Sequence, residues 1–264
     1  MPALNIAATG MLAQQTNVDV IANNLANMNT TGYKQQSAEF EDLIYQNQQL
    51  VGSQSSDTGS VLPSGIQLGS GVRTAAVARI TSQGNLQQTS NPYDLAIQGS
   101  GWFRIIQADG TDAYTRAGNF ALSPSGQIVT QEGAVVAPGI AVPQTATAVT
   151  VSAQGQVQAQ IPGQAAPQVL GQLELDRFPN EAGLGAQGNN LFMQTASSGG
   201  PQAGVPGTAG YGTIQQGYLE TSNVNAVQEI TSLITAQRAY EMNSKVVTAA
   251  NDMLQMTSNM GGSA

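Results

Sequence analysis

Three carboxylates, Glu39, Glu41 and Asp42, form the one acidic cluster of this chain. Two of them could serve as the acid and the base that cleave a glycosidic bond. They could equally occupy the wet face of a short helix, and we favour this second interpretation. The sequence has no His and no Cys, so the commonest general base, thiol nucleophile and metal ligands are absent. The sequence therefore predicts that the protein is not an enzyme and that it holds no metal or cofactor.

The sequence also gives little sign of a site for a dinucleotide, nucleic acid or a membrane. Gly99 and Gly101 begin a dinucleotide-type glycine pattern, but Arg104 stands where the third glycine is required. The net charge of -8, with only 8 Lys and Arg, gives no basic surface for nucleic acid or anionic lipid. No stretch approaches the ~20 apolar residues that cross a bilayer, and the first thirty residues lack the basic and apolar regions of a cleaved signal. We expect no nucleic acid, no membrane insertion and no cleaved signal peptide.

The two ends of the chain carry the strongest periodic patterns. Apolar residues recur every seven positions in both, which predicts helices over residues 3–28 and from 222–225 to 256. Each helix can bury its stripe only against the other helix or against another chain. The stripes consist of Leu4, Ala7, Met11, Gln14, Val18, Ile21, Leu25 and Met28 at one end, and of Ile230, Leu233, Ala236, Tyr240, Val247, Ala250 and Leu254 at the other.

Short strands and turns dominate the sequence between the two helices. From 72 to 221 the turns recur every ~8 to 12 residues, which is typical of an antiparallel all-β domain. Residues 33–71 form a connector, in which 38–45 has the pattern of a short helix and 46–71 is an extended segment. The predicted fold class is α+β, with long N- and C-terminal helices (1–32 and 222–264) paired as a coiled coil around a central antiparallel β-domain.

Three separated groups of motifs resemble those of one protein family. The chain reads ANNLANMNTTGYK at 22–34, NPYDLAIQGSGWF at 91–103 with YTRAGNF at 114–120, and GYLETSNVN at 217–225 with AQRAYE at 236–241. These segments resemble, in order and over nearly the whole chain, the signatures of the bacterial flagellar rod and hook axial proteins. The length and the connector, with Leu62-Pro63-Ser64-Gly65, favour the distal rod within that family, and a proximal rod or hook subunit is the alternative.

The resemblance implies a structural role. Members of the family pair their terminal helices as an inner tube with the β-domains outside, and they leave the cell by flagellar type III export. We therefore expect a subunit that polymerises into a rigid helical drive shaft in the basal body, spanning periplasm to outer membrane and transmitting torque from motor to hook. Its expected partners are copies of itself, proximal rod proteins, the hook and the surrounding periplasmic and outer-membrane ring proteins. An alternative of another class is an oligomeric β-module that binds a glycan or a surface protein.

Two asparagines and two residues near the carboxyl end are singled out for subunit packing. Asn23 and Asn27 lie one helical turn apart, away from the apolar stripe, and could form either a row of amide contacts between subunits or a solvated face. Arg238 could pair between subunits with a carboxylate such as Glu229, Glu241 or Asp42, or it could lie on a solvated face, and we favour the first; Tyr240 is expected to pack in the seam. The full set predicted for subunit packing is Leu4, Met11, Val18, Ile21, Asn23, Leu25, Asn27, Ile230, Leu233, Arg238, Tyr240, Val247 and Leu254.

Overall fold

The computed structural model describes residues 2–49, 65–164 and 166–261. The chain divides into two compact units, of which the first contains residues 1–25, 36–78 and 226–264, and the second contains residues 26–35 and 79–225. The first unit is built from six elements: α1 (Pro2–Ala26), β1 (Gln36–Asp42), β2 (Tyr45–Gln49), β3 (Ile66–Gly69), β4 (Val72–Arg79) and α2 (Ala226–Gly261).

Both predicted terminal helices are present. α1 has 25 residues and α2 has 36, so they are about 38 Å and 54 Å long. α1 ends at Ala26, two residues before the predicted end, because residues 27–32 form turns that finish at Gly32 with a φ of 68°. α2 continues five residues beyond Met256. Neither helix in the described ranges combines the length and apolar character needed to span a bilayer.

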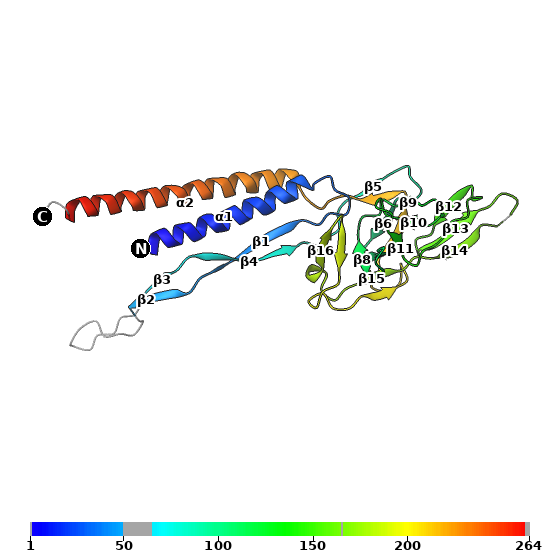
Figure 1. The fold of residues 1–264 in the computed structure, drawn as a ribbon, viewed down its shortest axis with the longest axis horizontal. Coiled ribbons are helices and arrows are strands. Elements are labelled where there is room, and N and C mark those ends of the chain that lie inside the picture. The colour runs from blue at the N-terminus through cyan, green and yellow to red at the C-terminus, as the bar shows by residue number, and fades with distance from the viewer. Residues whose placement is uncertain (1, 50–64, 165, 262–264) are drawn as a thin grey trace. The chain divides into compact units, whose positions relative to one another are not determined.

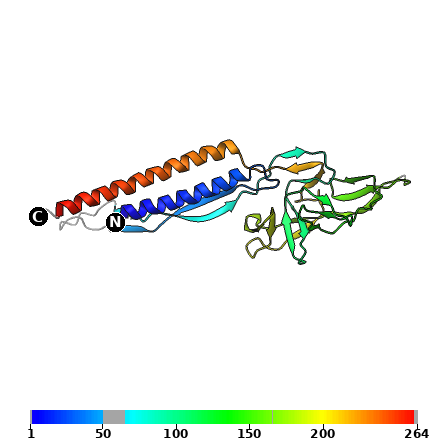
Figure 2. The same cartoon turned by 45° about the horizontal axis from the view of Figure 1, so that its top comes forward.

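The two helices lie side by side and run in opposite directions (Figures 1 and 2). They approach most closely near Gly10, where an added Cβ would lie only 2.9 Å from the side-chain nitrogen of Asn243. On another side, α1 contacts the strands: the backbone N–H of Val72 donates to the hydroxyl of Thr9 at 3.4 Å. Within this unit α1 thus packs against both α2 and the β-strands.

The prediction of a short helix over 38–45 is wrong. Residues 36–42 form strand β1, which pairs with β4, and β2 pairs antiparallel with β3 as a hairpin. Pairing with a strand about thirty residues away overrides the local helical pattern, and Glu39, Glu41 and Asp42 lie exposed on this two-stranded sheet. The extended segment predicted over 46–71 agrees with β2 and β3, whereas Leu62, Pro63 and Ser64 lie outside the described residues.

The second unit consists of short antiparallel strands. Its largest sheet has the order β16-β17-β8-β7-β11-β10-β9, with β15 pairing both β7 and β18, and smaller sheets are β12-β13-β14, β19-β6 and β20-β5. The central antiparallel β-domain is therefore confirmed. Its elements are β5 (Leu86–Gln88), β6 (Leu95–Gln98), β7 (Trp102–Ile106), β8 (Asp112–Thr115), β9 (Ala121–Leu122), β10 (Ile128–Val129), β11 (Val135–Val136), β12 (Ala148–Val151), β13 (Gln156–Gln160), β14 (Gln168–Gln172), β15 (Leu175–Arg177), the 3-10 turn η1 (Glu181–Gly183), β16 (Gly185–Gly188), β17 (Leu191–Met193), β18 (Gln202–Gly204), β19 (Thr213–Gln216) and β20 (Tyr218–Glu220).

Strand β7 supplies the centre of two hydrophobic clusters. Phe103 packs in the larger cluster, edge to face with Phe120, and Trp102 packs edge to face with Phe192 in the smaller one. Trp102 is 0% exposed and Phe103 is 1% exposed, so the prediction that both belong to the β-domain core is confirmed. This core gives the unit a rigid scaffold for the polar contacts described next.

Candidate functional site: a buried ionic junction and the faces of the terminal helices

Glu220 is the centre of a buried ionic junction in the second unit. One carboxylate oxygen, Oε1, accepts hydrogen bonds from Lys34 Nζ at 2.6 Å and from the backbone N–H of Gly84 at 3.0 Å. The other oxygen, Oε2, lies 3.6 Å from Nε of Arg116. Lys34, Arg116 and Glu220 are 2%, 4% and 1% exposed, so water contributes almost nothing to balancing their charges. Two buried cations therefore depend on one buried carboxylate.

Burial and the neighbouring charges shift the pKa of the two cations. Burial lowers the pKa of Lys34, the carboxylate of Glu220 raises it in opposition, and the guanidinium of Arg116 lowers it further. Burial likewise lowers the pKa of Arg116, opposed by Glu220 and by Glu181. Arg116 also donates to the backbone oxygen of Gly99 at 2.8 Å, and Lys34 to that of Ser82 at 2.9 Å. The carboxylate of Glu220 thus opposes the effect of burial on the pKa of both cations.

Backbone hydrogen bonds tie the same segments together. The N–H of Gly32 donates to the backbone oxygen of Glu220 at 2.8 Å, and the N–H of Gln35 donates to Oδ1 of Asn223 at 2.7 Å. Asn223 in turn donates to the backbone oxygen of Ile80 at 3.0 Å. Residues 32–35 follow α1 and residues 220–223 precede α2. The junction therefore holds the segment that leaves α1 beside the segment that leads into α2.

Gly32 has no room for a side chain at this junction. Its φ is 68°, and an added Cβ would lie 2.7 Å from the backbone nitrogen of Ala117. We expect Gly32→Ala to lower the free energy of unfolding by more than about 2 kcal/mol, from strain plus the clash. The matched control is Gly110→Ala, because Gly110 has a φ of 82° with nothing within 4 Å, and should cost only about 1 kcal/mol. Equal losses in urea unfolding of the two variants would contradict this reading.

The residues predicted for subunit packing are distributed over both helices in three classes of burial. The only fully buried one is Ile21, at 5% exposed, and it shares this burial with Ala7, Ala236 and Ala250 of the same stripes. Tyr240 and Ile230 are exposed at 43% and 46%. The partly buried ones are Leu4, Met11, Val18, Leu25, Asn27, Leu233, Val247 and Leu254, while Asn23 and Arg238 are exposed.

Three of these residues lie in the single chain in ways that the sequence patterns did not indicate, and their roles between subunits stay predictions. Asn27 lies in the turn after Ala26, where its Oδ1 accepts a hydrogen bond from the Thr30 hydroxyl at 3.1 Å, so it is not part of the helical row predicted with Asn23. Tyr240 is an exposed residue of the single chain and not part of its core. Within one chain Glu229 is buried and accepts a hydrogen bond from Asn24, whereas Arg238 lies exposed, so pairing of Arg238 with a carboxylate of another subunit stays a prediction.

Asn24 is the contact residue that the sequence patterns missed. Its Nδ2 donates to the backbone oxygen of Gln36 at 2.8 Å and to Oε2 of Glu229 at 3.3 Å, while its Oδ1 accepts from the N–H of Gln36 at 2.9 Å. It joins α1 to both β1 and α2 within the first unit. The available signal was its spacing, because Asn24 follows the buried Val20 and Ile21 by four and three positions, which places it on the buried face.

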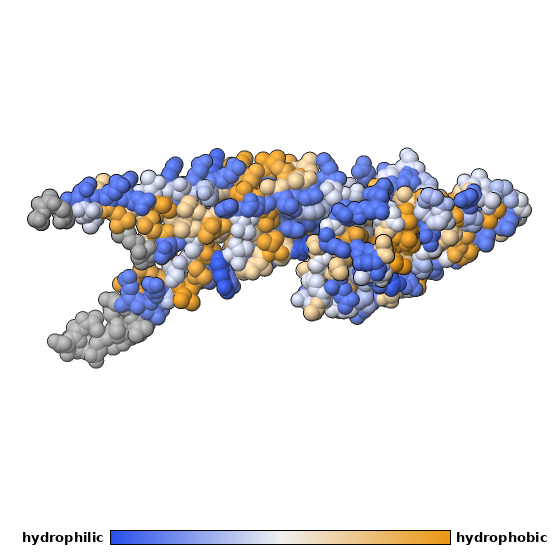
Figure 3. Space-filling view, viewed as in Figure 1, coloured by the Kyte–Doolittle hydropathy of each residue, from blue (hydrophilic) through white to orange (hydrophobic). Residues whose placement is uncertain are grey.

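Much of the apolar surface of α2 is uncovered. Figure 3 shows apolar side chains gathered over the first turns of this helix. Large side chains are 45% to 76% exposed there and further along: Val227, Ile230, Ile234, Met242, Val246, Met253 and Met256. A helix that is apolar on its packed side and again on its outer side is typical of an element buried by more than one neighbour.

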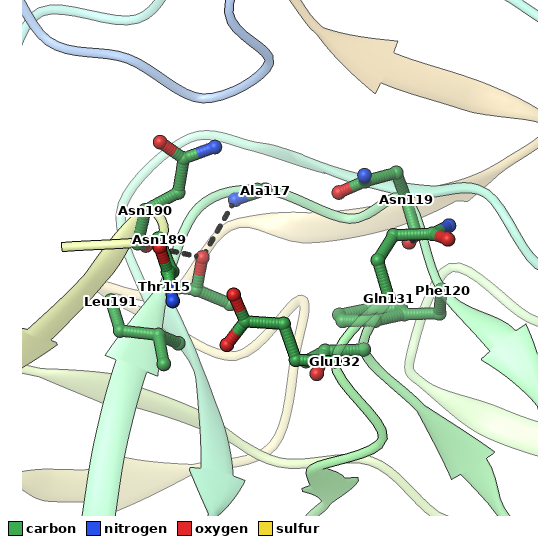
Figure 4. A pocket seen from close by; sticks show the side chains of 10 residues that line it. Thr115, Ala117, Asn119, Phe120, Gln131, Glu132, Asn189, Asn190 and Leu191 are labelled. Carbon is green, nitrogen blue, oxygen red and sulfur yellow. Dashed lines mark hydrogen bonds between the residues drawn. The ribbon is translucent and has the colours of Figure 1, made fainter.

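A small polar pocket in the second unit gives no comparable signal (Figure 4). It has a volume of about 160 Å³, and Thr115, Asn119, Gln131, Glu132 and Asn190 are among its lining residues. The Thr115 hydroxyl donates to the backbone oxygen of Asn190 at 2.7 Å, so part of its polar lining is already satisfied. Ligand pockets are usually about 300–1,000 Å³. This pocket is below that range and by itself gives no support to the glycan-binding alternative.

Comparison with known proteins places this geometry in a family. Three family profiles match the chain: "Flagella basal body rod protein" over residues 4–34, "Flagellar hook protein FlgE/F/G D1 domain" over 96–159, and "Flagellar basal body rod FlgEFG protein C-terminal" over 215–260. The flagellar basal-body rod protein FlgG of Caulobacter vibrioides is 55% identical over 260 residues, covering 98% of this chain and 99% of that protein. The chain belongs to the flagellar basal-body rod protein family.

Two further relatives locate this rod protein within the family. FlgG of Agrobacterium fabrum is 53% identical, with 98% of each chain covered. FlgF of Caulobacter vibrioides is only 35% identical, over 93% of this chain and 91% of that protein, although FlgG of the same organism is 55% identical. The rod protein described here is accordingly a structural subunit of the flagellar distal rod.

The buried junction unites the three parts of this rod protein that match the family. Lys34 belongs to the segment matched at 4–34, Arg116 to the segment at 96–159 and Glu220 to the segment at 215–260. All three motifs are visible in the sequence, but their spacing does not indicate that these three charges meet. The scarcity of charge was the signal that could have singled them out, because charged residues make up only 9% of the chain and each of these three stands inside a motif.

Proposed function

We propose that the chain polymerises through its two terminal helices into the rigid, open helical shaft of the distal rod, which transmits torque from the motor to the hook. The observation that carries this proposal is the uncovered apolar surface of α2, including Val227 at 76% and Met256 at 65% exposed, together with Leu12 of α1 at 65%. Such side chains cost free energy in water and gain it by packing against another copy. A head-to-tail contact whose rotation does not close produces a filament.

The helices would form the inner tube of that shaft as a coiled coil, with the β-units outside. The heptad stripes support this arrangement, because their half-buried members, such as Met11, Val18 and Val247, would complete their burial among neighbouring subunits. The buried junction supports stiffness, because it holds the connections to both helices in one place. The shaft performs no chemistry and needs no cofactor; its strength lies in packing.

The proposed export route, location and neighbours of the subunit follow from the same role in the distal rod. The subunit leaves the cell by flagellar type III export without a cleaved signal and joins a rod that spans from the periplasm to the outer membrane. Its neighbours are further copies, proximal rod proteins and the hook. The surrounding periplasmic and outer-membrane ring proteins act as a bushing, and the low charge of the chain suits a rotor that must not adhere to them.

The test compares the full chain with a trimmed chain that lacks residues 1–25 and 226–264. Light scattering and circular dichroism are recorded at rising protein concentration. We expect the full chain to elongate without a defined end size above a critical concentration, and the trimmed chain to stay monomeric and β-rich. A full chain that stops at a small, fixed oligomer would refute the open shaft and would favour a closed bundle that presents a β-domain for binding.

A further inference from the structure

We propose that Asp19 on α1 of one copy forms an ion pair with Arg238 on α2 of a neighbouring copy and so sets the axial register between subunits. This inference rests on the proposed polymerisation through the helices. Asp19 is the only charged residue of α1, and it is exposed. Among the residues that the structure describes, it forms no ion pair. A lone charge on an otherwise neutral helix selects its neighbour by sign.

The matching cations lie on the outer face of α2. Arg238 follows the buried Ala236 by two positions, which is about 200° around the helix, so it points away from the packed side. Lys245 follows Arg238 by seven positions and shares its face. Both are exposed, and neither forms an ion pair within the described ranges. This outer face thus carries two cations about 10.5 Å apart, with the exposed carboxylate of Glu241 between them, three positions after Arg238 and four before Lys245.

A groove between the helices shows which cation stands level with Asp19. Asp19 directly follows one lining residue and Arg238 directly follows another, so the two charges lie within about one helical turn of the same level of the helix pair. The groove has a volume of about 390 Å³ and is lined by Gln15, Val18, Gln237, Tyr240 and Glu241. Copies that pack side by side with little axial offset would bring Asp19 to Arg238, whereas an offset of two helical turns would bring it to Lys245.

Apolar contacts support the same register. Leu12 precedes Asp19 by seven positions and is 65% exposed. Because α1 and α2 run in opposite directions (Figure 1), the position opposite Leu12 would lie about seven residues beyond Arg238. Met242 and Val246, at 60% and 49% exposed, lie there. The charge pair would therefore be flanked by a hydrophobic contact, which supplies affinity while the charges fix the register.

Cysteine cross-linking tests the pair directly, because the chain contains no Cys. Asp19→Cys and Arg238→Cys chains are purified separately, mixed at a polymerising concentration and treated with a mild oxidant, which takes two electrons and two protons from a pair of thiols to form one disulfide. We expect a covalent dimer in the mixture and little in either variant alone. The control mixture combines Asp19→Cys with Lys245→Cys, and preferential cross-linking there would overturn the proposed register.

Charge exchange tests the same pair without changing the redox state. Asp19→Arg and Arg238→Asp should each raise the critical concentration about tenfold, because like charges then face each other. A chain carrying both substitutions should regain the wild-type critical concentration, while Asp19→Arg with Lys245→Asp should not. If the wild-type chain polymerises and the variants polymerise equally well without specific cross-links, this pair is refuted and the proposed function stands. If the wild-type chain fails to polymerise, the proposed function itself is refuted.

Discussion

Glu220→Gln is expected to destabilise the second unit by about 3–5 kcal/mol, the usual cost of leaving buried charge uncompensated. The substitution keeps the shape of the side chain but removes the one carboxylate that contacts both Lys34 and Arg116, which are 2% and 4% exposed. Fluorescence of Trp102 reports the unfolding, since it is the single Trp and is fully buried in this unit. The measurement is the free energy of unfolding in urea.

The matched variant at the same junction is Lys34→Met. It removes one of the two cations and leaves Arg116 paired with Glu220, so its cost should be smaller, about 1 kcal/mol for the lost hydrogen bonds. Equal losses from the two variants would contradict the picture of two cations sharing one carboxylate.

The pH dependence of the stability of the Glu220→Gln variant provides a second measurement. Because burial lowers the pKa of Lys34 in the fold, the folded state binds this proton less readily than the unfolded state does. The Glu220→Gln variant should regain stability as the pH rises from the folded pKa of Lys34 toward its ordinary value.

Leu233→Asp is expected to abolish polymerisation of the full chain while leaving the second unit folded. Leu233 is half-buried on the packed side of α2, near the buried Ala236, and a carboxylate there would have no partner when a neighbouring copy completes the burial. An unpaired buried charge costs several kcal/mol per subunit, which raises the critical concentration by more than about a hundredfold. Light scattering at rising concentration measures this loss.

Two controls separate assembly from folding in that experiment. Leu233→Met keeps the apolar volume and should polymerise nearly as the wild type does. The urea midpoint reported by Trp102 should be unchanged in both variants, because Trp102 belongs to the second unit and Leu233 to the first. Normal polymerisation of the Leu233→Asp chain would overturn the assignment of this stripe to subunit packing.

The sequence by itself determined the elements whose signals are local. Heptad spacing of residues such as Leu4, Met11 and Leu233 specified both terminal helices, and regular turns specified an antiparallel β-domain between them. The three motif groups also specified the flagellar family, which the relatives confirm. These inferences succeeded because a helix repeats every 3.6 residues and a turn occupies a few positions, so a short window contains the whole signal.

Tertiary structure decided the elements that depend on distant partners. Residues 38–45 have a helical pattern but contribute to strands, because β1 pairs with β4 and Asn24 holds the start of β1. The boundary of α1 at Ala26 likewise reflects the turn that delivers Gly32 to the junction. Pairing over long sequence separations leaves no periodic trace in either segment taken alone.

The buried ionic junction shows most clearly how contacts between distant segments depend on the tertiary structure. Lys34, Arg116 and Glu220 are separated by 82 and 104 positions in the sequence, yet they share one buried contact network. Their motifs could be recognised individually, but a buried ion pair requires that both charges be withdrawn from water together, and only the folded chain specifies that. Local pattern therefore determined which elements form and which family the chain belongs to, while chain folding determined which of its few charges meet.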